Sequence, residues 1–375
     1  MLRPMTRIAV LFALPCLVSA LTPVATAQRT LAELERRFRD EVQQLAATSP
    51  SREQRQQQLD RHVERLRAFV ADEAQGDDRW NGRLMLADLE LARGGRDAAA
   101  AALRGIDAAA APGMVLVTAA AMAQHLQLTE QRDAWVAAAV GKDAPLPERL
   151  AMARLLMTVL GEITHGEAIF AKALQGADDD EQRAYVRWHR ADALRDREDL
   201  PENTAFDELE ALARDLPDTY WGGVAKDRLR ATRIAPGDPA IDFRCRTLDG
   251  DEVTLAGLRG KAVVLAFWTA ADFDTPRLVA LLEELQARHA DLAVLGICLD
   301  RDPEEIRRAT RELGIEFPVV GDGKGPENDA ALRWFVEGPV VHVVDKQGKV
   351  AGLGLIAGTA DGRAELSDVV ARAVR

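Results

Sequence analysis

The chain contains little sulfur and few aromatic rings. Its 375 residues include three cysteines, and aromatic residues make up 5% of the sequence. So few cysteines cannot build the disulfide framework that stabilises small exported domains. A folded chain of this length must therefore be stabilised by buried aliphatic side chains, and its length favours two domains of ordinary size.

Apolar runs long enough to span a membrane are also missing. One early apolar stretch, Ile8 to Val18, follows two arginines and precedes Ala25-Thr26-Ala27. The stretch is too short to cross a bilayer, and this order of charge, apolar run and small residues is typical of a cleavable signal peptide. We therefore expect a mature protein that begins at about Gln28, in the periplasm or outside the cell.

Positive charge is in short supply as well. Lys and Arg number 48 against 60 Asp and Glu, which gives a formal net charge of −12, and loss of the two leader arginines makes it −14. Such a chain repels phosphate backbones and anionic lipids, so we expect no nucleic-acid partner and no binding to a membrane surface. Because no later apolar run is long enough to cross a bilayer, we also expect no membrane span. The histidines show no metal-ligand spacing and the loop Gly321 to Pro326 lacks a phosphate-binding ending, so no metal or cofactor is expected.

The first half of the mature chain has the composition and the hydrophobic pattern of a helical domain. From Thr30 to about Arg233 it is rich in Ala, Leu, Arg, Glu and Gln and shows no sustained period-two alternation. Helices of about 12 to 15 residues joined by short turns predict an all-α, repeat-like array. Its last unit, Phe206 to Leu229, resembles a tetratricopeptide-type repeat, in which a small residue such as Gly222 lets neighbouring helices approach closely.

The texture changes at Ile234, where prolines and glycines mark a domain junction. The predicted organisation is a signal peptide over 1–27, a helical repeat-like domain over 28–233 and an α/β domain over 234–375. In the last domain, the apolar run Ala262 to Trp268 predicts a buried strand, and a helix is expected from about Pro276 to Ala290. Leu292 to Leu299 reads as a central parallel strand.

The α/β domain resembles the thioredoxin-fold redoxins of the bacterial envelope, which include TlpA-like and ResA-like proteins and the wider AhpC/TSA group. The resemblance runs from about Pro236 to the C-terminus and implies a thioredoxin-like fold with thiol oxidoreductase or peroxidase ancestry. It is carried by several features in order: Pro236 to Phe243, Asp249-Gly250, Gly260-Lys261 before Phe267-Trp268, Asp300, Gly314 to Pro318, and Gly338-Pro339 followed by Asp345 and Gly348.

The redox motif of this family is missing from its usual place. In relatives a Cys-x-x-Cys motif follows the strand, and counting forward from Trp268 puts Asp272 at the first cysteine and Thr275 at the second. No cysteine occurs between Phe267 and Ile297. Without a thiolate there is no nucleophile for disulfide exchange or peroxide attack, so thiol catalysis is predicted to be lost and no residue is assigned as catalytic.

Two other interpretations concern the acidic turn and the remaining cysteines. Asp272-Phe273-Asp274-Thr275 looks like the start of a haloacid-dehalogenase phosphatase motif, but Asp274 or Thr275 could instead cap a helix whose first turn contains Pro276. Cys245 and Cys298 could form a relocated redox pair, although buried structural cysteines are commoner than reactive ones.

Pro339 matches the family's cis-proline, which faces the active turn and presents backbone to an extended substrate strand. That surface could still hold a protein or peptide partner by strand addition, or the proline could serve only a tight turn. The leading hypothesis is a binding or scaffolding module of the cell envelope without redox cysteines. The alternatives are a divergent thiol oxidoreductase or peroxidase that uses Cys245 and Cys298, and a purely structural envelope protein; the oligomeric state stays open.

Overall fold

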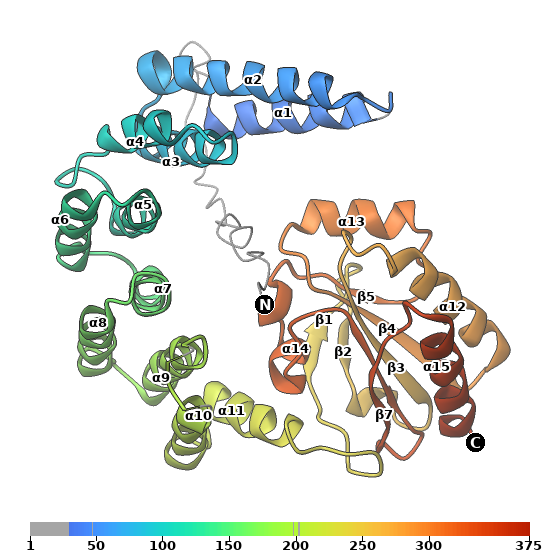
Figure 1. The fold of residues 1–375 in the computed structure, drawn as a ribbon. Coiled ribbons are helices and arrows are strands. Elements are labelled where there is room, and N and C mark those ends of the chain that lie inside the picture. The colour runs from blue at the N-terminus through green and yellow to red at the C-terminus, as the bar shows by residue number, and fades with distance from the viewer. Residues whose placement is uncertain (1–29, 47, 198, 202) are drawn as a thin grey trace, which may run out of the picture. The chain divides into compact units, whose positions relative to one another are not determined.

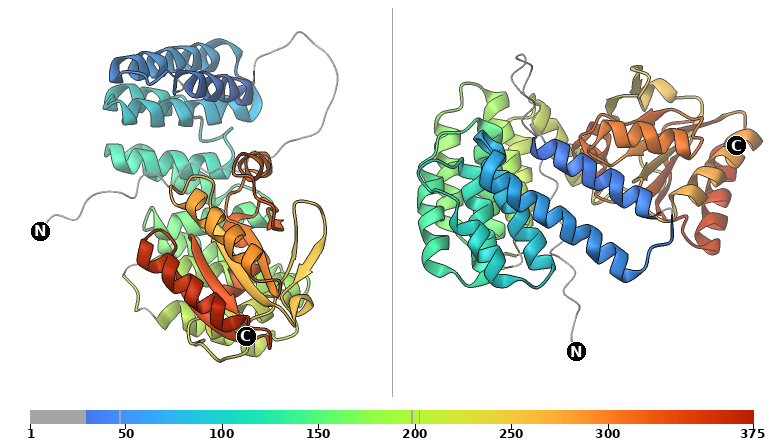
Figure 2. Two further views of the ribbon diagram at one scale, coloured as in Figure 1. Left: turned by 90° about the vertical axis from the view of Figure 1, so that its right-hand side faces the viewer. Right: turned by 90° about the horizontal axis from the view of Figure 1, so that it is seen from above.

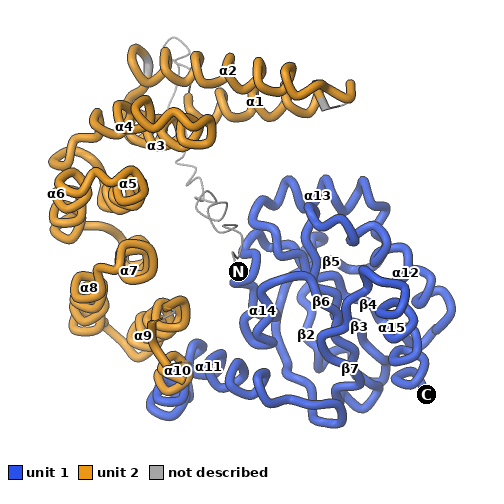
Figure 3. Tube along the Cα trace, viewed as in Figure 1, with its two compact units in different colours: residues 1–18, 209–375 blue, residues 19–208 orange. Residues whose placement is uncertain are grey.

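The computed structural model describes residues 30–375 except residues 47, 198 and 202. The predicted signal peptide and the cleavage site before Gln28 lie outside the described residues. By packing, the chain divides into two compact units, one of which ends at Glu208 while the other runs from Leu209 to Arg375 (Figure 3). In the described part, no helix is both long enough and apolar enough to cross a membrane.

The unit that ends at Glu208 is helical, as predicted. Consecutive helices form pairs, and α3, α5, α7 and α9 also contact one another in succession, so the pairs stack in series (Figure 1). A short π-helical segment extends α2. The elements are α1 (Leu31–Ala46), α2 (Arg52–Ala68), η2 (Phe69–Glu73), α3 (Gly76–Ala92), α4 (Arg96–Arg104), α5 (Gly113–Leu126), α6 (Thr129–Val140), α7 (Leu146–Thr158), α8 (Ile163–Gln175) and α9 (Asp180–Arg195). The next helix, α10 (Asn203–Asp215), crosses the boundary between the two units after Glu208.

Local signals in the sequence explain where these helices begin and end. Asp179 is the N-cap of α9 and its carboxylate accepts a hydrogen bond from the backbone N–H of Gln182 at 2.7 Å. Gly94 follows the end of α3 with a φ of +79°, a conformation that glycine adopts without steric cost. This glycine therefore allows α3 to end directly after its C-cap residue, Arg93.

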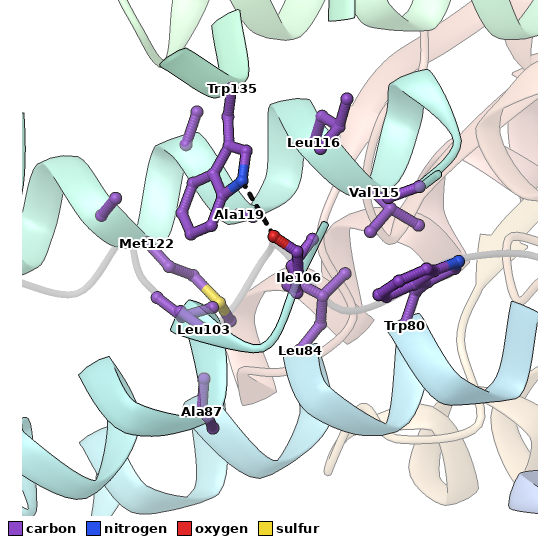
Figure 4. Close-up of a cluster of buried hydrophobic side chains, with 14 of the residues drawn as sticks. Trp80, Leu84, Ala87, Leu103, Ile106, Val115, Leu116, Ala119, Met122 and Trp135 are labelled. Atoms are coloured by element: carbon purple, nitrogen blue, oxygen red, sulfur yellow. Dashed lines mark hydrogen bonds between the residues drawn. The ribbon is translucent and has the colours of Figure 1, made fainter. Parts of the chain in front are cut away.

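The core of this unit is built from aliphatic and tryptophan side chains (Figure 4). Trp135 on α6 is fully buried, and its indole N–H donates to the backbone oxygen of Ile106 at 3.4 Å. Leu103 and Leu116 pack in the same cluster, as does Trp80 from α3. The large aromatic side chains therefore stabilise the stacked helix pairs, as expected of aromatic rings on helices.

The unit from Leu209 to Arg375 is built around a five-stranded sheet with the order β5-β4-β3-β6-β7. β3, β4 and β5 are parallel, whereas β6 and β7 run antiparallel to their neighbours, and β1 and β2 form a separate hairpin. The strands are β1 (Arg244–Arg246), β2 (Glu252–Thr254), β3 (Ala262–Trp268), β4 (Leu292–Cys298), β5 (Val319–Val320), β6 (Val340–Val344) and β7 (Val350–Leu355).

Helices connect and cover these strands. α12 and α15 contact each other and pack on the same face of the sheet (Figure 2). α14 and α15 have no counterpart among the predicted elements, and α14 is too short to show a helical period. The helices are α11 (Tyr220–Ala231), α12 (Thr275–Arg288), α13 (Pro303–Glu312), α14 (Asp329–Trp334) and α15 (Ala360–Ala373), with 3-10 turns η3 (Ala256–Leu258) and η4 (Gly325–Glu327).

The sheet separates two hydrophobic cores. Successive side chains of β3 point to opposite faces, so Val264, Ala266 and Trp268 join the α12 and α15 side, whereas Leu265 and Phe267 join the other side. Every residue of β3 is buried. The predicted buried strand is confirmed, and the fold of this unit is thioredoxin-like.

The helix before the sheet, α11, belongs to the same unit as the sheet. Its Asp227 accepts a charged hydrogen bond from Arg333 of α14 at 2.6 Å, and its Tyr220 hydroxyl donates to Asp329 at 2.8 Å. The guanidinium of Arg228, a buried residue, lies over the ring of Phe335. The sequence pattern changes from helical to strand-like near residue 234, whereas the two compact units divide earlier, after Glu208.

Candidate functional site

The turn after β3 is the place where the resembled family carries its chemistry. β3 ends at Trp268, whose backbone oxygen accepts a hydrogen bond from the N–H of Leu299 at 2.8 Å. Residues 269–274 then form a turn that leads into α12. The strand, turn and helix predicted between Ala262 and Ala290 are therefore confirmed.

Asp272 lies in the middle of this turn and is partly exposed. Its carboxylate accepts a hydrogen bond from the backbone N–H of Asp274 at 3.0 Å. Within residues 30–375, apart from the three undescribed positions, no Lys, Arg or His forms an ion pair with Asp272. At the position of the family's first redox cysteine, Asp272 therefore has a carboxylate that forms no ion pair with a described basic residue.

Thr275, the second degenerate position, is only 2% exposed. Its hydroxyl donates to the backbone oxygen of Thr269 at 2.8 Å. This hydrogen bond closes the turn and uses the hydroxyl proton, so Thr275 serves to hold the backbone rather than to face solvent.

The prediction that Asp274 or Thr275 caps α12 is confirmed for the position of Asp274, but not for a capping hydrogen bond from its side chain. Asp274 occupies the N-cap position, but its side chain makes no capping hydrogen bond because the carboxylate pairs with Arg277 at 2.8 Å. Pro276 does lie in the first turn, as predicted. The Asp274 carboxylate therefore pairs with Arg277 in the first turn of α12 instead of accepting a capping hydrogen bond.

The phosphatase interpretation requires its first aspartate directly after a strand. Asp272 is instead the fourth residue after Trp268, and its carboxylate is engaged with the turn backbone. No group of three or more His, Cys, Asp or Glu side chains in the described part is arranged to hold a metal ion. The geometry therefore fits a helix start better than a phosphatase motif.

Cys298 lies at the end of β4, directly beside Trp268 in the parallel register. It is 1% exposed, and its thiol contacts the carboxylate of Asp300 at 3.2 Å. The same carboxylate oxygen accepts a hydrogen bond from the N–H of Ala270 at 2.7 Å. Burial, and to a smaller extent the nearby carboxylate, raise the pKa of the Cys298 thiol, so this sulfur stays protonated at neutral pH.

Cys245 is on β1 and is also buried and unpaired. Burial raises the pKa of its thiol to about 12. Cys245 packs in the core that contains Phe267, whereas Cys298 packs in the core that contains Trp268, on the opposite face of the sheet. The structure therefore does not bring the two thiols together, because a β-sheet separates them.

Pro339 lies at the same end of the sheet as the turn. Val340 pairs with Phe267, so the residue before Val340 lies next to Trp268. The described residues contain no cis peptide bond, so the bond before Pro339 is trans and the expectation of a cis-proline is wrong. An X-Pro bond prefers trans by about 0.5–1 kcal/mol unless its surroundings fix the cis form, and Pro339 is exposed.

The sequence analysis missed two exposed apolar side chains at this end of the sheet. Phe273 in the turn is 79% exposed, and Ile356, just after β7, is 66% exposed. The guanidinium of Arg277 lies 4.9 Å from the centroid of the Phe273 ring. The signal available in the sequence was an apolar residue between two aspartates, which a buried ring rarely has as neighbours.

The sheet order, the covering helices and the turn after β3 define a thioredoxin-fold redoxin domain. The model of the AhpC/TSA family matches residues 236–352. The ResA thiol-disulfide oxidoreductase of Bacillus thuringiensis is 30% identical over 136 residues, which cover 35% of this chain and 75% of that protein. The chain therefore belongs to the AhpC/TSA family, and its C-terminal domain is a ResA-like redoxin.

Other proteins match a similar share of the chain. The thioredoxin-like protein YneN of Bacillus subtilis is 27% identical over 136 residues, which cover 35% of this chain and 78% of that protein. Among solved structures, the thioredoxin domain of a thiol-disulfide oxidoreductase from Bacteroides vulgatus is 23% identical and covers 38% of this chain and 99% of that chain, with a TM-score of 0.34.

Proposed function

We propose that this protein is an exported binding or scaffolding module whose redoxin domain no longer performs thiol chemistry. One observation carries the proposal. The turn after β3 holds Asp272 and Thr275 instead of cysteines, and the two thiols in the described part are buried in cores on opposite faces of the sheet.

The chemistry supports this interpretation because the thiolate, and not the protonated thiol, is the form of cysteine that attacks a disulfide or a peroxide. With a pKa of about 12, Cys245 is a thiolate in about one molecule in 10⁵ at pH 7. Cys298 has its pKa raised in the same direction by burial. Thiol exchange also needs access to the sulfur, and neither sulfur is on the surface.

The name of the relative from Bacillus thuringiensis describes a thiol-disulfide oxidoreductase. A divergent oxidoreductase that uses Cys245 and Cys298 is therefore the main alternative. It would require the sheet to open before the two sulfurs could meet, since each belongs to a different core. No observation in the structure favours that step.

The proposed export of the protein rests on the signal peptide that the sequence predicts. The predicted signal peptide would deliver the mature protein to an oxidising compartment, where a domain without redox cysteines cannot be switched by disulfide exchange at its turn. A constitutive binding role fits such a compartment, and the partner would be a protein or peptide.

The first experiment measures thiol reactivity and turnover in the mature protein. Cys245 and Cys298 should react with a chromogenic disulfide reagent only after denaturation, and the protein should neither reduce insulin nor consume hydroperoxide. The matched control is the double variant Asp272→Cys with Thr275→Cys, which restores the Cys-x-x-Cys spacing. Its turn should gain at least one thiol that reacts in the folded protein.

A second result would decide against the proposal. If the wild-type protein turned over insulin or hydroperoxide at a rate that Cys298→Ser or Cys245→Ser abolished, the protein would be a divergent oxidoreductase. The single variants also show which sulfur is responsible, since each leaves the other in place.

A further inference from the structure

The first helix pair of the helical unit leaves part of its apolar stripe uncovered. The apolar residues of α1 recur at helical spacing: Leu31, Leu34, Phe38, Val42 and Leu45. α3 lies against the start of this stripe, where the carboxylate of Asp78 accepts a hydrogen bond from the backbone N–H of Leu31 at 2.9 Å. The α1–α2 pair then extends past α3 (Figure 1 and Figure 2), so α3 does not cover the second half of the stripe.

This uncovered half borders a groove of about 520 Å³. The groove is lined by Phe38, Val42 and Leu45 of α1, together with Pro50 and Arg55. Val42 is 43% exposed, which is unusual for an apolar side chain on the inward stripe of a helix. The groove is therefore an apolar surface that a further helix could cover.

The apolar wall of the groove is fixed in place. The Phe38 ring stacks on His62 of α2, with 4.0 Å between the ring centroids and 11° between the ring planes. His62 is itself buried. A surface that is already ordered loses little conformational entropy when it is covered, so its apolar area contributes more fully to association.

Two charged side chains beside this groove form no ion pair within the described part of the chain. Glu35 lies one turn before Phe38 on the same face of α1. Burial raises the pKa of its carboxyl group, and the nearby Arg39 offsets part of that shift. Arg55 donates to the backbone oxygen of Pro50 at 3.0 Å but meets no described carboxylate. The groove therefore has an anion without an ion pair near one end and such a cation near the other.

The order of these groups along the helix is self-complementary. Glu35 lies about 10 Å before Val42 along the axis of α1. Arg55 lies beyond Val42, beside Pro50 in the turn that follows α1. When α1 meets an antiparallel copy of itself centred on Val42, the Glu35 of each copy meets the Arg55 of the other, and a two-fold axis supplies this contact twice. A second copy of the chain therefore provides the missing charge at both ends of the groove.

The surface formed by Glu35, Phe38, Val42, Leu45 and Arg55 is called the α1 surface below. We propose that two copies of the mature chain associate through the α1 surface in this two-fold arrangement, with Val42 at the axis and Glu35 paired with Arg55 at both ends. The covered apolar area is small, so the dimer should be weak and in exchange with the monomer. This inference goes beyond the proposed function, because it concerns how the chain assembles and not what it binds.

Sedimentation velocity of the full mature protein from about 1 µM to about 300 µM tests for the dimer. The wild-type protein should shift from monomer to dimer across this range. Val42→Glu should weaken association by about 10-fold or more, because it removes the central apolar contact and brings two carboxylates together at the axis. The matched control is Ile356→Glu, which changes a 66% exposed apolar side chain of the redoxin unit and should leave association unchanged.

Charge exchange tests the two-fold arrangement. Glu35→Arg and Arg55→Glu should each weaken association by about 10-fold, since each replaces two opposite-charge contacts by two like-charge contacts. An equimolar mixture of the two variants should associate about as tightly as the wild-type protein, because each variant then meets its opposite charge at both ends. The control is Arg36→Glu, which changes an exposed charge of α1 outside the α1 surface and should have no effect.

A cross-link tests the position of the axis. Val42→Cys should form a disulfide-linked dimer under mild oxidation, because a residue at a two-fold axis lies next to its own copy. Arg36→Cys, which is exposed on the same helix, should not. The native Cys245 and Cys298 are buried and do not compete for the cross-link.

Several outcomes would overturn the inference. They are a monomer at every concentration, a dimer that Val42→Glu leaves unchanged, mixed charge variants that associate no better than either alone, and equal cross-linking of Val42→Cys and Arg36→Cys. Circular dichroism and urea midpoints separate a lost surface from a lost fold, and Val42→Ser replaces Val42→Glu if the latter unfolds. Failure of the proposed function is read separately, as cysteine-dependent turnover in the thiol assays.

Discussion

Acidification should destabilise the redoxin unit through one buried histidine, His342 on β6. This side chain is 7% exposed and stacks on the ring of Trp334, with 5.2 Å between centroids. Its Nδ1 accepts a hydrogen bond from the backbone N–H of Gly354 at 3.1 Å, so the ring is in the neutral form with the proton on Nε2. Burial lowers the pKa of His342 from 6.5 to about 4.

The sign and size of the effect follow from the two pKa values. Between about pH 6.5 and pH 4 the unfolded chain binds a proton on His342 that the folded chain does not. Stability is therefore complete above pH 6.5 and falls as the pH drops toward 4. The loss is about 2 kcal/mol at pH 5 and approaches about 3 kcal/mol near pH 4, from the cost of 1.36 kcal/mol per pKa unit.

The assay compares the wild-type protein with His342→Gln at pH 7 and pH 5. Glutamine can still accept from Gly354 but does not titrate in this range. Hydrogen exchange of peptides that cover β6 and β7, measured by mass spectrometry under mild urea, reports the opening free energy of this unit. The control is His62→Gln, which removes a buried histidine from the helical unit, where burial also lowers the pKa to about 4.

The expected result is a steep pH dependence in the wild-type protein and in His62→Gln, and a shallow one in His342→Gln. The variant should be less stable than the wild type at pH 7, because it loses the stacked ring. If His342→Gln and the wild type lost equal opening free energy between pH 7 and pH 5, the linkage argument would be refuted.

Three further predictions concern stability measured by urea unfolding of the full chain. Gly222→Ala should cost about 3 kcal/mol, because its Cβ would clash with the backbone oxygen of Leu216, the residue after α10. Gly141→Ala, whose Cβ would have its nearest contact at 3.7 Å, should cost less than about 1 kcal/mol. A double-mutant cycle on Arg333 and Asp227 should give a coupling of about 1 kcal/mol, and zero coupling would contradict their ion pair. Thr275→Val should cost about 1 kcal/mol by removing a buried hydrogen bond, and an unchanged midpoint would contradict that role.

Some elements could be predicted from the sequence because a local pattern specifies them. Seven consecutive apolar residues from Ala262 to Trp268 are typical of a central strand that is buried on both faces, and the structure buries all of them. The helix stop at Gly94 follows from a single residue that tolerates positive φ. The missing cysteines at Asp272 and Thr275 could also be read from the sequence, since the motif has a fixed spacing.

Other features needed long-range contacts. Nothing local shows that Cys245 and Cys298 lie in different cores, since that depends on how the β1 hairpin and β4 are placed around one sheet. The exposure of Phe273 also depends on the surrounding fold, because the same residue could have been buried by a longer helix or loop. The trans bond before Pro339 is the intrinsic preference of an X-Pro bond, and whether the surroundings override that preference is decided by the fold.

The sequence by itself determined that the first half is helical and that the second half is an α/β domain of redoxin lineage. It also determined that the turn after β3 has no cysteine. These features depend only on residue type and spacing. The tertiary structure decided which core α11 joins, through Asp227 and an arginine 106 residues further along the chain. It also decided that two apolar side chains meet solvent beside Asp272. Both depend on segments far apart in sequence, whose proximity no local pattern encodes.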